Sequence, residues 1–77
     1  MYIVKYERYG IPGEHRFGTL KEAMDSSAGD IEFNMAYPIE IINEDTRKVE
    51  KTRKQIVDYC HKKYNELYEE NKKQKNR

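Results

Sequence analysis

The sequence has no tryptophan, a single cysteine, Cys60, and no long run of apolar residues. One cysteine excludes an internal disulfide and is typical of a protein in a reducing compartment. No apolar stretch is long enough for a membrane-spanning helix. The opening residues, MYIVKYERYG, lack the basic start and the apolar run of a signal peptide. We therefore expect a cytoplasmic protein that makes no contact with a membrane.

Apolar residues are scarce in the chain as a whole. They make up 36% of the 77 residues, whereas charged residues make up 38%. A single domain of this size buries only about 60% of its unfolded surface, so its core must be thin. Such a core leaves little room for a cofactor pocket of roughly 300–1,000 Å³. We therefore expect that the protein is not an enzyme and binds no cofactor. Dimerisation would be an ordinary way to support so small a core.

Residues that could carry catalysis or bind a metal are also few. Cys60 stands next to His61, but adjacent residues of a helix point about 100° apart and do not face each other. Cys60 falls within the apolar stripe of the last predicted helix, which favours a buried apolar role. Structural zinc requires four ligands, usually as two close pairs. Cys60, His61, His15 and Asp58 are the available residues, and they supply only one such pair. The sequence thus predicts neither a catalytic nucleophile nor a metal site.

The first part of the chain predicts a β-hairpin. Residues 1–9 are rich in β-formers and alternate in polarity, which indicates a strand. The sequence GIPG at 10–13 predicts a turn, because two glycines and a proline leave no regular alternative. We expect EHRF at 14–17 to return as a short second strand that brings Phe17 over the first.

The run GTLKEAM predicts the first helix. Thr19 and Glu22 have the spacing of a capping box, in which the hydroxyl accepts from one free backbone amide and the carboxylate reaches back to another. We expect a helix from Leu20 to about Ala28. Gly29 can then end it in the left-handed conformation.

The sequence leaves two alternatives for residues 30–36, a strand or a continuation of the helix. Alternating apolar and polar residues favour a strand there, but a helical stripe also extends as far as Met35. From Tyr37 to Asn43 the same alternation predicts a strand, and Pro38 fits the start or the edge of a sheet.

The remaining chain predicts a second turn, strand and helix. NEDTR at 43–47 has turn chemistry. KVEK at 48–51 should pair back as a fourth strand with Val49 pointing inward. Thr52 and Gln55 form a second capping box in TRKQ.

A closing helix is expected from Arg53 to about Lys72. It carries an apolar stripe on one face, formed by Ile56, Val57, Cys60, Tyr64, Leu67 and Tyr68. The basic residues 72–77 include no apolar side chain and should be a frayed tail. We therefore predict one α+β domain over residues 1–71, with the order ββαββα and an antiparallel sheet covered by helices.

The charge is divided unevenly along the chain. Residues 1–46 contain four Lys or Arg and nine Asp or Glu, a net charge of −5. Residues 47–77 contain eleven Lys or Arg and five Asp or Glu, a net charge of +6. The split indicates either an anionic partner for the second part or two parts that face each other within the fold.

A cationic cluster stands where the last helix is expected to begin. Its members are Arg47, Lys48, Lys51, Arg53 and Lys54. Cations at a helix start oppose the helix dipole by about 0.3–1 kcal/mol each when exposed. A cluster that breaks this local rule is a candidate binding site. A phosphate backbone or an acidic protein surface would satisfy it, but Glu44, Asp45 and the acidic first part could also neutralise it internally.

Tyr59 follows this cluster and lies off the predicted apolar stripe. Its ring could stack on a nucleic-acid base, since single-strand binders use exposed aromatic rings in this way. It could also contact a protein partner or lie at the margin of a thin core.

The run FGTLKEA at 17–23 resembles the strand-to-helix junction of the small N-terminal arm-binding domains of tyrosine integrases. Those domains have the pattern F-x-T-x-x-E-A after a three-stranded sheet, and the resemblance implies DNA contact through that sheet. The whole chain, with its tyrosine-rich hairpin, capped helix and PIEII run before a D-T turn, also resembles small accessory proteins of low-GC Gram-positive bacteria and their phages. That resemblance implies a compact regulatory protein.

The sequence therefore predicts a non-enzymatic interaction module that binds a macromolecular partner. A protein partner is favoured, nucleic-acid binding through residues 47–54 is the alternative, and a homodimer is compatible with both. No catalytic, cofactor or metal residue is predicted. The predicted contact residues are Arg47, Lys48, Lys51, Arg53, Lys54 and Tyr59.

Overall fold

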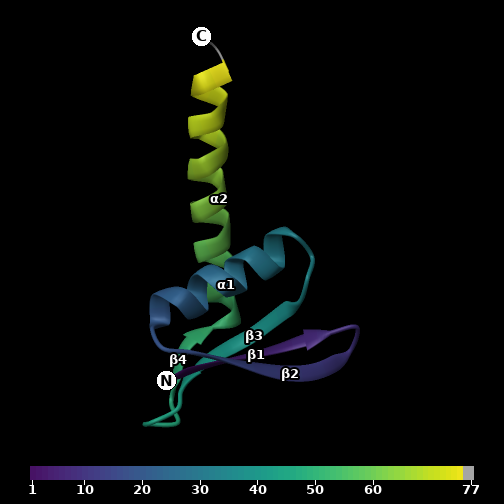
Figure 1. Cartoon of the computed structure of the whole chain (residues 1–77), viewed down its shortest axis with the longest axis vertical. Coiled ribbons are helices and arrows are strands. Elements are labelled where there is room, and N and C mark those ends of the chain that lie inside the picture. Colours follow the sequence, from purple (N-terminus) through teal and green to yellow (C-terminus); the bar gives the residue numbers. More distant parts are fainter. Residues whose placement is uncertain (76–77) are drawn as a thin grey trace.

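The computed structural model describes the backbone of residues 1–75 and the side chains of residues 1–67. The chain folds in the order ββαββα, as predicted, into a small α+β domain (Figure 1). The elements are β1 (Tyr2–Arg8), β2 (Ile11–Phe17), α1 (Leu20–Glu32), β3 (Tyr37–Asn43), β4 (Val49–Thr52) and α2 (Arg53–Lys75).

The four strands form one antiparallel sheet in the order β2-β1-β3-β4. Val4 of β1 and Ile41 of β3 lie opposite each other and are buried, which identifies the covered face of the sheet. Both helices pack on that face. Figure 1 shows α1 lying along the sheet, whereas α2 leaves the sheet and extends beyond α1.

The β1–β2 hairpin turns earlier than predicted. Arg8 pairs with Ile11, so the loop consists of Tyr9 and Gly10 alone. Their φ angles are +54° and +78°, as in the type I′ turn that matches the twist of a two-stranded hairpin. The predicted turn at 10–13 is therefore wrong, and β2 begins at Ile11 instead of residue 14.

The proline and glycine of GIPG are accommodated within β2. Because β2 is an edge strand, the missing amide of Pro12 need not break a ladder between two strands. Gly13 lies opposite Tyr6, and a Cβ at Gly13 would come within 2.6 Å of the Tyr6 ring. The glycine therefore makes room for the Tyr6 ring and does not mark the turn.

Helix α1 begins as predicted and ends later. The Thr19 hydroxyl accepts a hydrogen bond from the Glu22 amide at 3.1 Å, which caps the first turn. Gly29 does not end the helix, which continues to Glu32.

Asn34 takes the left-handed conformation that was expected of Gly29, with φ +55°. The Asn34 amide donates to the Ile31 carbonyl, and the Met35 amide donates to the Asp30 carbonyl. These two bonds form a Schellman motif, which satisfies carbonyls that the helix end leaves free. Residues 30–36 are thus the last turn of α1 followed by this cap, and not a strand.

Strand β3 spans Tyr37–Asn43, as predicted. The β3–β4 register shifts between Ile41 and Ile42, so that Ile41 pairs with Lys51 and Ile42 pairs with Val49. Val49 was expected to point inward, but it is 50% exposed. The shift places Val49 beside Ile42 on the uncovered face of the sheet.

Helix α2 begins at Arg53 behind the predicted capping box. The Gln55 side chain accepts from the Thr52 amide at 2.9 Å, and the Thr52 hydroxyl accepts from the Gln55 amide at 3.4 Å. The helix runs to Lys75, three residues past the expected end. The predicted frayed tail, 72–77, includes residues 76–77, which lie outside the described residues. That tail and the domain limit at residue 71 stay predictions.

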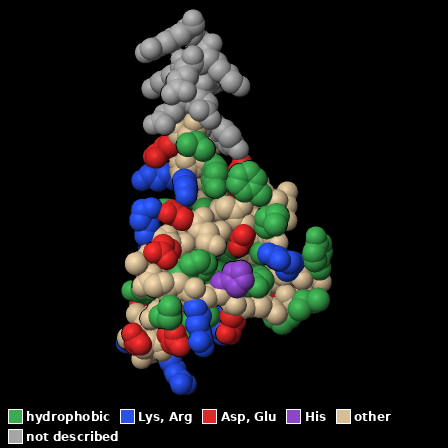
Figure 2. Space-filling model, viewed as in Figure 1, with side chains coloured by type: hydrophobic (Ala, Val, Ile, Leu, Met, Phe, Trp, Pro, Cys, Tyr) green, Lys and Arg blue, Asp and Glu red, His purple; other side chains and the backbone are tan. Residues whose placement is uncertain are grey.

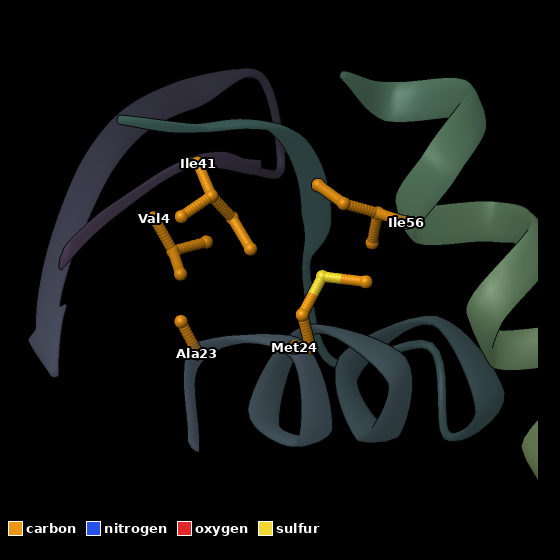
Figure 3. Packing of buried hydrophobic residues seen from close by; sticks show 5 residues of the cluster. All are labelled: Val4, Ala23, Met24, Ile41 and Ile56. Carbon is orange, nitrogen blue, oxygen red and sulfur yellow. The ribbon is translucent and has the colours of Figure 1, made fainter. Parts of the chain in front are cut away.

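The core is a single small layer between the sheet and the two helices (Figure 3). Val4 and Ile41 point from the sheet toward Ala23 and Met24 of α1, and Ile56 of α2 closes the side. Ile41 and Ile56 are completely buried. The core therefore joins the sheet, α1 and α2 through very few side chains.

Replacing Ile41 with alanine should destabilise the fold strongly. The substitution leaves a cavity where β1, α1 and α2 converge, and we expect a loss of about 2–5 kcal/mol in the free energy of unfolding. Urea denaturation followed by circular dichroism measures it. Val49→Ala, on the half-exposed face, is the matched control and should cost less than about 1 kcal/mol. Equal effects of the two substitutions would show that the core is misplaced.

Candidate functional site

The predicted cationic cluster does not form one site. Arg47 and Lys48 lie exposed in the turn between β3 and β4. Arg53 follows the four residues of β4, and a strand rises about 3.3 Å per residue. Its guanidinium lies over the ring of Tyr37, the first residue of β3, at 3.6 Å from the ring centroid. Arg53 and Arg47 are therefore at opposite ends of the β3–β4 pair.

The other two lysines of the cluster have different surroundings again. Lys51 pairs with Ile41, so its side chain starts from the covered face of the sheet, and it is partly buried. Lys54 is exposed on the first turn of α2. These five cations are close together in the sequence, but the fold does not bring them together at one place.

Internal neutralisation of the cluster is not observed in the described part of the chain. Glu44 lies 3.6 Å from Arg16, and Asp45 lies 3.9 Å from the N-terminal amine. Within the side chains of residues 1–67, no ion pair involves a member of the cluster. The cations at 47–54 are therefore available to an outside anion, although not at a single point.

Arg47 has an unusual backbone conformation. Its φ is +60°, and its amide donates to the Asn43 carbonyl at 2.7 Å. The Asn43 side chain accepts from the Asp45 amide and completes the turn. A non-glycine residue in the left-handed region costs about 1 kcal/mol or more, so a glycine or an asparagine would suit this position better.

Tyr59 belongs to an interhelical cluster and not to the cationic one. Its ring packs against the core, and its hydroxyl donates to the Asp25 carboxylate of α1. Lys21 and Lys63 also donate to Asp25, at 2.7 and 3.0 Å. Lys63 lies in the basic second part of the chain and Asp25 in the acidic first part, so the two parts do face each other here.

This cluster shifts the pKa values of Asp25 and Tyr59. Hydrogen bonds from Lys21, Tyr59 and Lys63 hold the pKa of the Asp25 carboxyl well below its usual range. The hydrogen bond to Asp25 raises the pKa of the Tyr59 hydroxyl. Asp25 is only 28% exposed, and it ties α1 to α2. The sequence analysis did not single it out, because its partners in α2 are 34 and 38 residues away.

Asp25→Asn should destabilise the protein in a pH-dependent way. A carboxyl whose pKa is lowered by folding stabilises the fold above its unfolded pKa of about 4, and this contribution is lost as the pH falls toward the folded pKa. The wild type should therefore be more stable than the variant near pH 7, and the difference should narrow toward pH 2. Urea midpoints at several pH values measure this.

Asp58→Asn is the control for the titration of Asp25, because Asp58 is exposed on α2 and forms no ion pair with the side chains of residues 1–67. Its urea midpoint near pH 7 should stay close to that of the wild type, as expected for an exposed charge. A difference between wild type and Asp25→Asn that does not depend on pH would contradict the assigned role of Asp25.

Cys60 is buried, as expected, with 1% of its surface exposed. Its thiol donates to the Ala28 carbonyl at 3.4 Å, and burial raises the pKa of the thiol. Among the described residues, no group of three or more His, Cys, Asp or Glu side chains is arranged to hold a metal ion. In the same part of the chain, no helix has the length and apolar character needed to cross a membrane.

A surface that the sequence analysis missed lies at the tip of the β1–β2 hairpin. Large apolar side chains are exposed there and at the facing α1–β3 turn: Tyr9 (97%), Ile11 (68%), Met35 (56%) and Tyr37 (45%). Figure 2 shows hydrophobic side chains gathered at this end of the molecule. Together with Arg8 and Arg53 we call these residues the hairpin-end surface.

Three adjoining hollows make this surface continuous. One, of about 220 Å³, is lined by Tyr9 and Ile11. It shares Arg8 and Tyr9 with a second, of about 230 Å³, which extends to Met35 and Tyr37. Tyr37 in turn lines a third, of about 190 Å³, with Arg53 at its side. The hairpin-end surface therefore contains hollows along its whole width, from Tyr9 to Arg53.

Two arginines are fixed on the hairpin-end surface by neighbouring groups. The Arg8 side chain donates to the Met35 carbonyl at 2.9 Å, which links the hairpin to the α1–β3 turn. The Arg53 guanidinium stacks on Tyr37. Of the predicted contact residues, Arg53 alone belongs to this surface. The missed signal was Tyr9-Gly10, which forms a two-residue turn although it departs from the usual Asn-Gly or Asp-Gly pattern.

No family model, no curated protein and no solved structure matches the chain. The resemblance to integrase arm-binding domains stays a prediction. The strand-to-helix junction at Phe17 to Ala23 is present, but two strands precede α1 where those domains have three. The resemblance to small accessory proteins of Gram-positive bacteria and phages also stays a prediction.

Proposed function

We propose that this chain is a small non-enzymatic interaction module that acts in the cytosol and binds another protein through the hairpin-end surface. The composition of this surface supports the proposal. Tyrosine, methionine and arginine are enriched at protein–protein interfaces, and tyrosine and arginine dominate their binding energy. Tyr9, Met35, Tyr37, Arg8 and Arg53 supply all three types on one contoured surface.

The observation that carries the proposal is the state of Tyr9. Its side chain is 97% exposed, so it contributes almost nothing to the core. Its φ of +54° is costly for a tyrosine and easy for an asparagine. Stability alone would therefore favour another residue. A residue that breaks a local rule without a packing gain is expected where binding requires it.

The other cations of the predicted cluster lie away from this surface. Arg47, Lys48, Lys51 and Lys54 line none of its three hollows. Nucleic-acid binding through residues 47–54 is supported less well, because β4 separates Arg47 from Arg53 and Tyr59 is engaged by Asp25.

Tyr9→Asn should separate binding from stability. Asparagine suits a left-handed turn position, so the free energy of unfolding should rise by about 1 kcal/mol. Proteins captured from an extract of the source organism by immobilised wild type should be lost with this variant. Quantitative mass spectrometry of the captured proteins measures the loss, and urea denaturation measures stability.

Arg47→Asn is the matched control for Tyr9→Asn. It introduces the same residue, asparagine, at the other left-handed hairpin position, which lies at the opposite end of the sheet, and it should also stabilise the fold. It should retain the captured proteins. The proposal fails if Tyr9→Asn captures the same proteins as the wild type.

A random-sequence DNA duplex should not shift the amide signals of residues 47–59 at low salt. Binding through the whole cationic cluster would neutralise five phosphates and give a log–log salt slope of roughly −4 to −5. A titration followed by NMR at several salt concentrations measures both quantities. A slope of that size would favour the nucleic-acid alternative over the protein partner.

A further inference from the structure

The third hollow of the hairpin-end surface lies between the end of α1, the start of β3 and the start of α2. Ile31, Ala36, Pro38 and Val57 give it an aliphatic wall, and its volume is about 190 Å³. Pockets for small molecules and cofactors measure roughly 300–1,000 Å³. The hollow is therefore too small for such a ligand and has the size for one apolar side chain.

Arg53 at the side of this hollow has unused hydrogen-bonding capacity. The Cζ atom of its guanidinium lies over the Tyr37 ring, 3.6 Å from the ring centroid. Stacking occupies the face of the guanidinium and leaves its N–H groups, which point outward in the plane, free to donate. Among the described residues, no carboxylate pairs with Arg53. The Tyr37 ring thus holds the Arg53 guanidinium in place but accepts no hydrogen bond from its N–H groups.

The charge around the hollow favours a negatively charged ligand. Arg53 is the one ionisable side chain, apart from the Tyr37 phenol, among the residues that line it, and none of them is acidic. A carboxylate matches the guanidinium fork with two parallel hydrogen bonds. Glu7 lines the neighbouring hollow, so the preference for an acid is confined to the Arg53 end of the surface.

We propose that this hollow receives a Leu, Ile, Val, Met or Phe side chain of the partner protein, while Arg53 binds the Asp or Glu side chain within two residues of it. The inference rests on the proposed function and names the segment that the hairpin-end surface binds. The partner segment is an extended acidic and apolar peptide, because the adjoining hollows continue from Tyr37 toward Tyr9.

A second copy of this chain is the competing occupant. Glu66 and Leu67 are consecutive residues of α2, and Leu67 is 48% exposed. This pair has the same chemistry as the proposed ligand. Occupation by a second copy would link molecules head to tail, so sedimentation of the purified chain distinguishes it from a foreign partner.

The test is selection of displayed random heptapeptides on the immobilised full chain. Enriched peptides should carry Asp or Glu within two residues of a large apolar residue. One such peptide, acetylated and amidated so that only side-chain carboxylates remain, is then titrated against the protein and followed by NMR. Arg53→Gln should weaken its binding at least about tenfold, because charge-assisted hydrogen bonds are lost. Asn in place of the peptide's acid should have the same effect.

Two further variants keep the test decisive. Lys54→Gln removes the neighbouring charge outside the hollow and should change affinity by less than about threefold, as expected for an exposed charge. Arg53→Lys keeps the charge without the fork, and should bind more weakly than wild type. Urea denaturation confirms that each variant is folded.

The proposal is overturned if no peptide is enriched, if the enriched peptides have no common acid, or if Arg53→Gln binds them as wild type does. It is also overturned if the chain self-associates and Leu67→Lys abolishes the association. The proposed function is judged separately. A captured protein that Tyr9→Asn loses and Arg53→Gln retains supports the hairpin-end surface and refutes the acid-binding hollow.

Discussion

The burial of Val4 and Ile41 beneath two helices is the interaction on which the rest of the structure depends. These two paired side chains of the central strands belong to the same buried cluster as Ala23 and Met24 of α1 and Ile56 of α2. The clustered apolar side chains of the described core all lie in this one layer, while other large apolar side chains, such as Tyr9 and Ile11, stay exposed. The core among the described residues is thin, and the hollows described above are open at the surface.

Order and capping were predictable because they depend on neighbouring residues. Thr19 and Thr52 each predict a helix start, because each has a Glu or Gln three residues later, as in a capping box. Both caps are present. The ββαββα order followed from these two helix starts and from the alternation before them. The end of α1 was not predictable in the same way. Asn34 and Gly29 both suit a left-handed position, and only Asn34 is placed where the Schellman bonds can form.

The candidate site was predicted much less well than the fold. Arg47 and Arg53 are close in sequence, but an extended strand carries them to opposite ends of the β3–β4 pair. The contact between Arg53 and Tyr37, and that between Arg8 and Met35, join positions 16 and 27 residues apart. Pairing of this kind is set by the sheet register, which a local pattern does not specify. The distribution of charged residues along the sequence therefore did not predict where these charges lie in the structure.

The two register shifts along β3 have a consequence for how the chain reaches this fold. Aliphatic residues occupy consecutive positions in both central strands, Ile3-Val4 and Ile41-Ile42, so either face of each strand would be acceptable to a hydrophobic layer. A slip by one residue would then meet little resistance from polarity alone. The bulges at Lys5/Tyr6 and Ile41/Ile42 fit one alignment only. They therefore favour the observed register over one that is slipped by a residue.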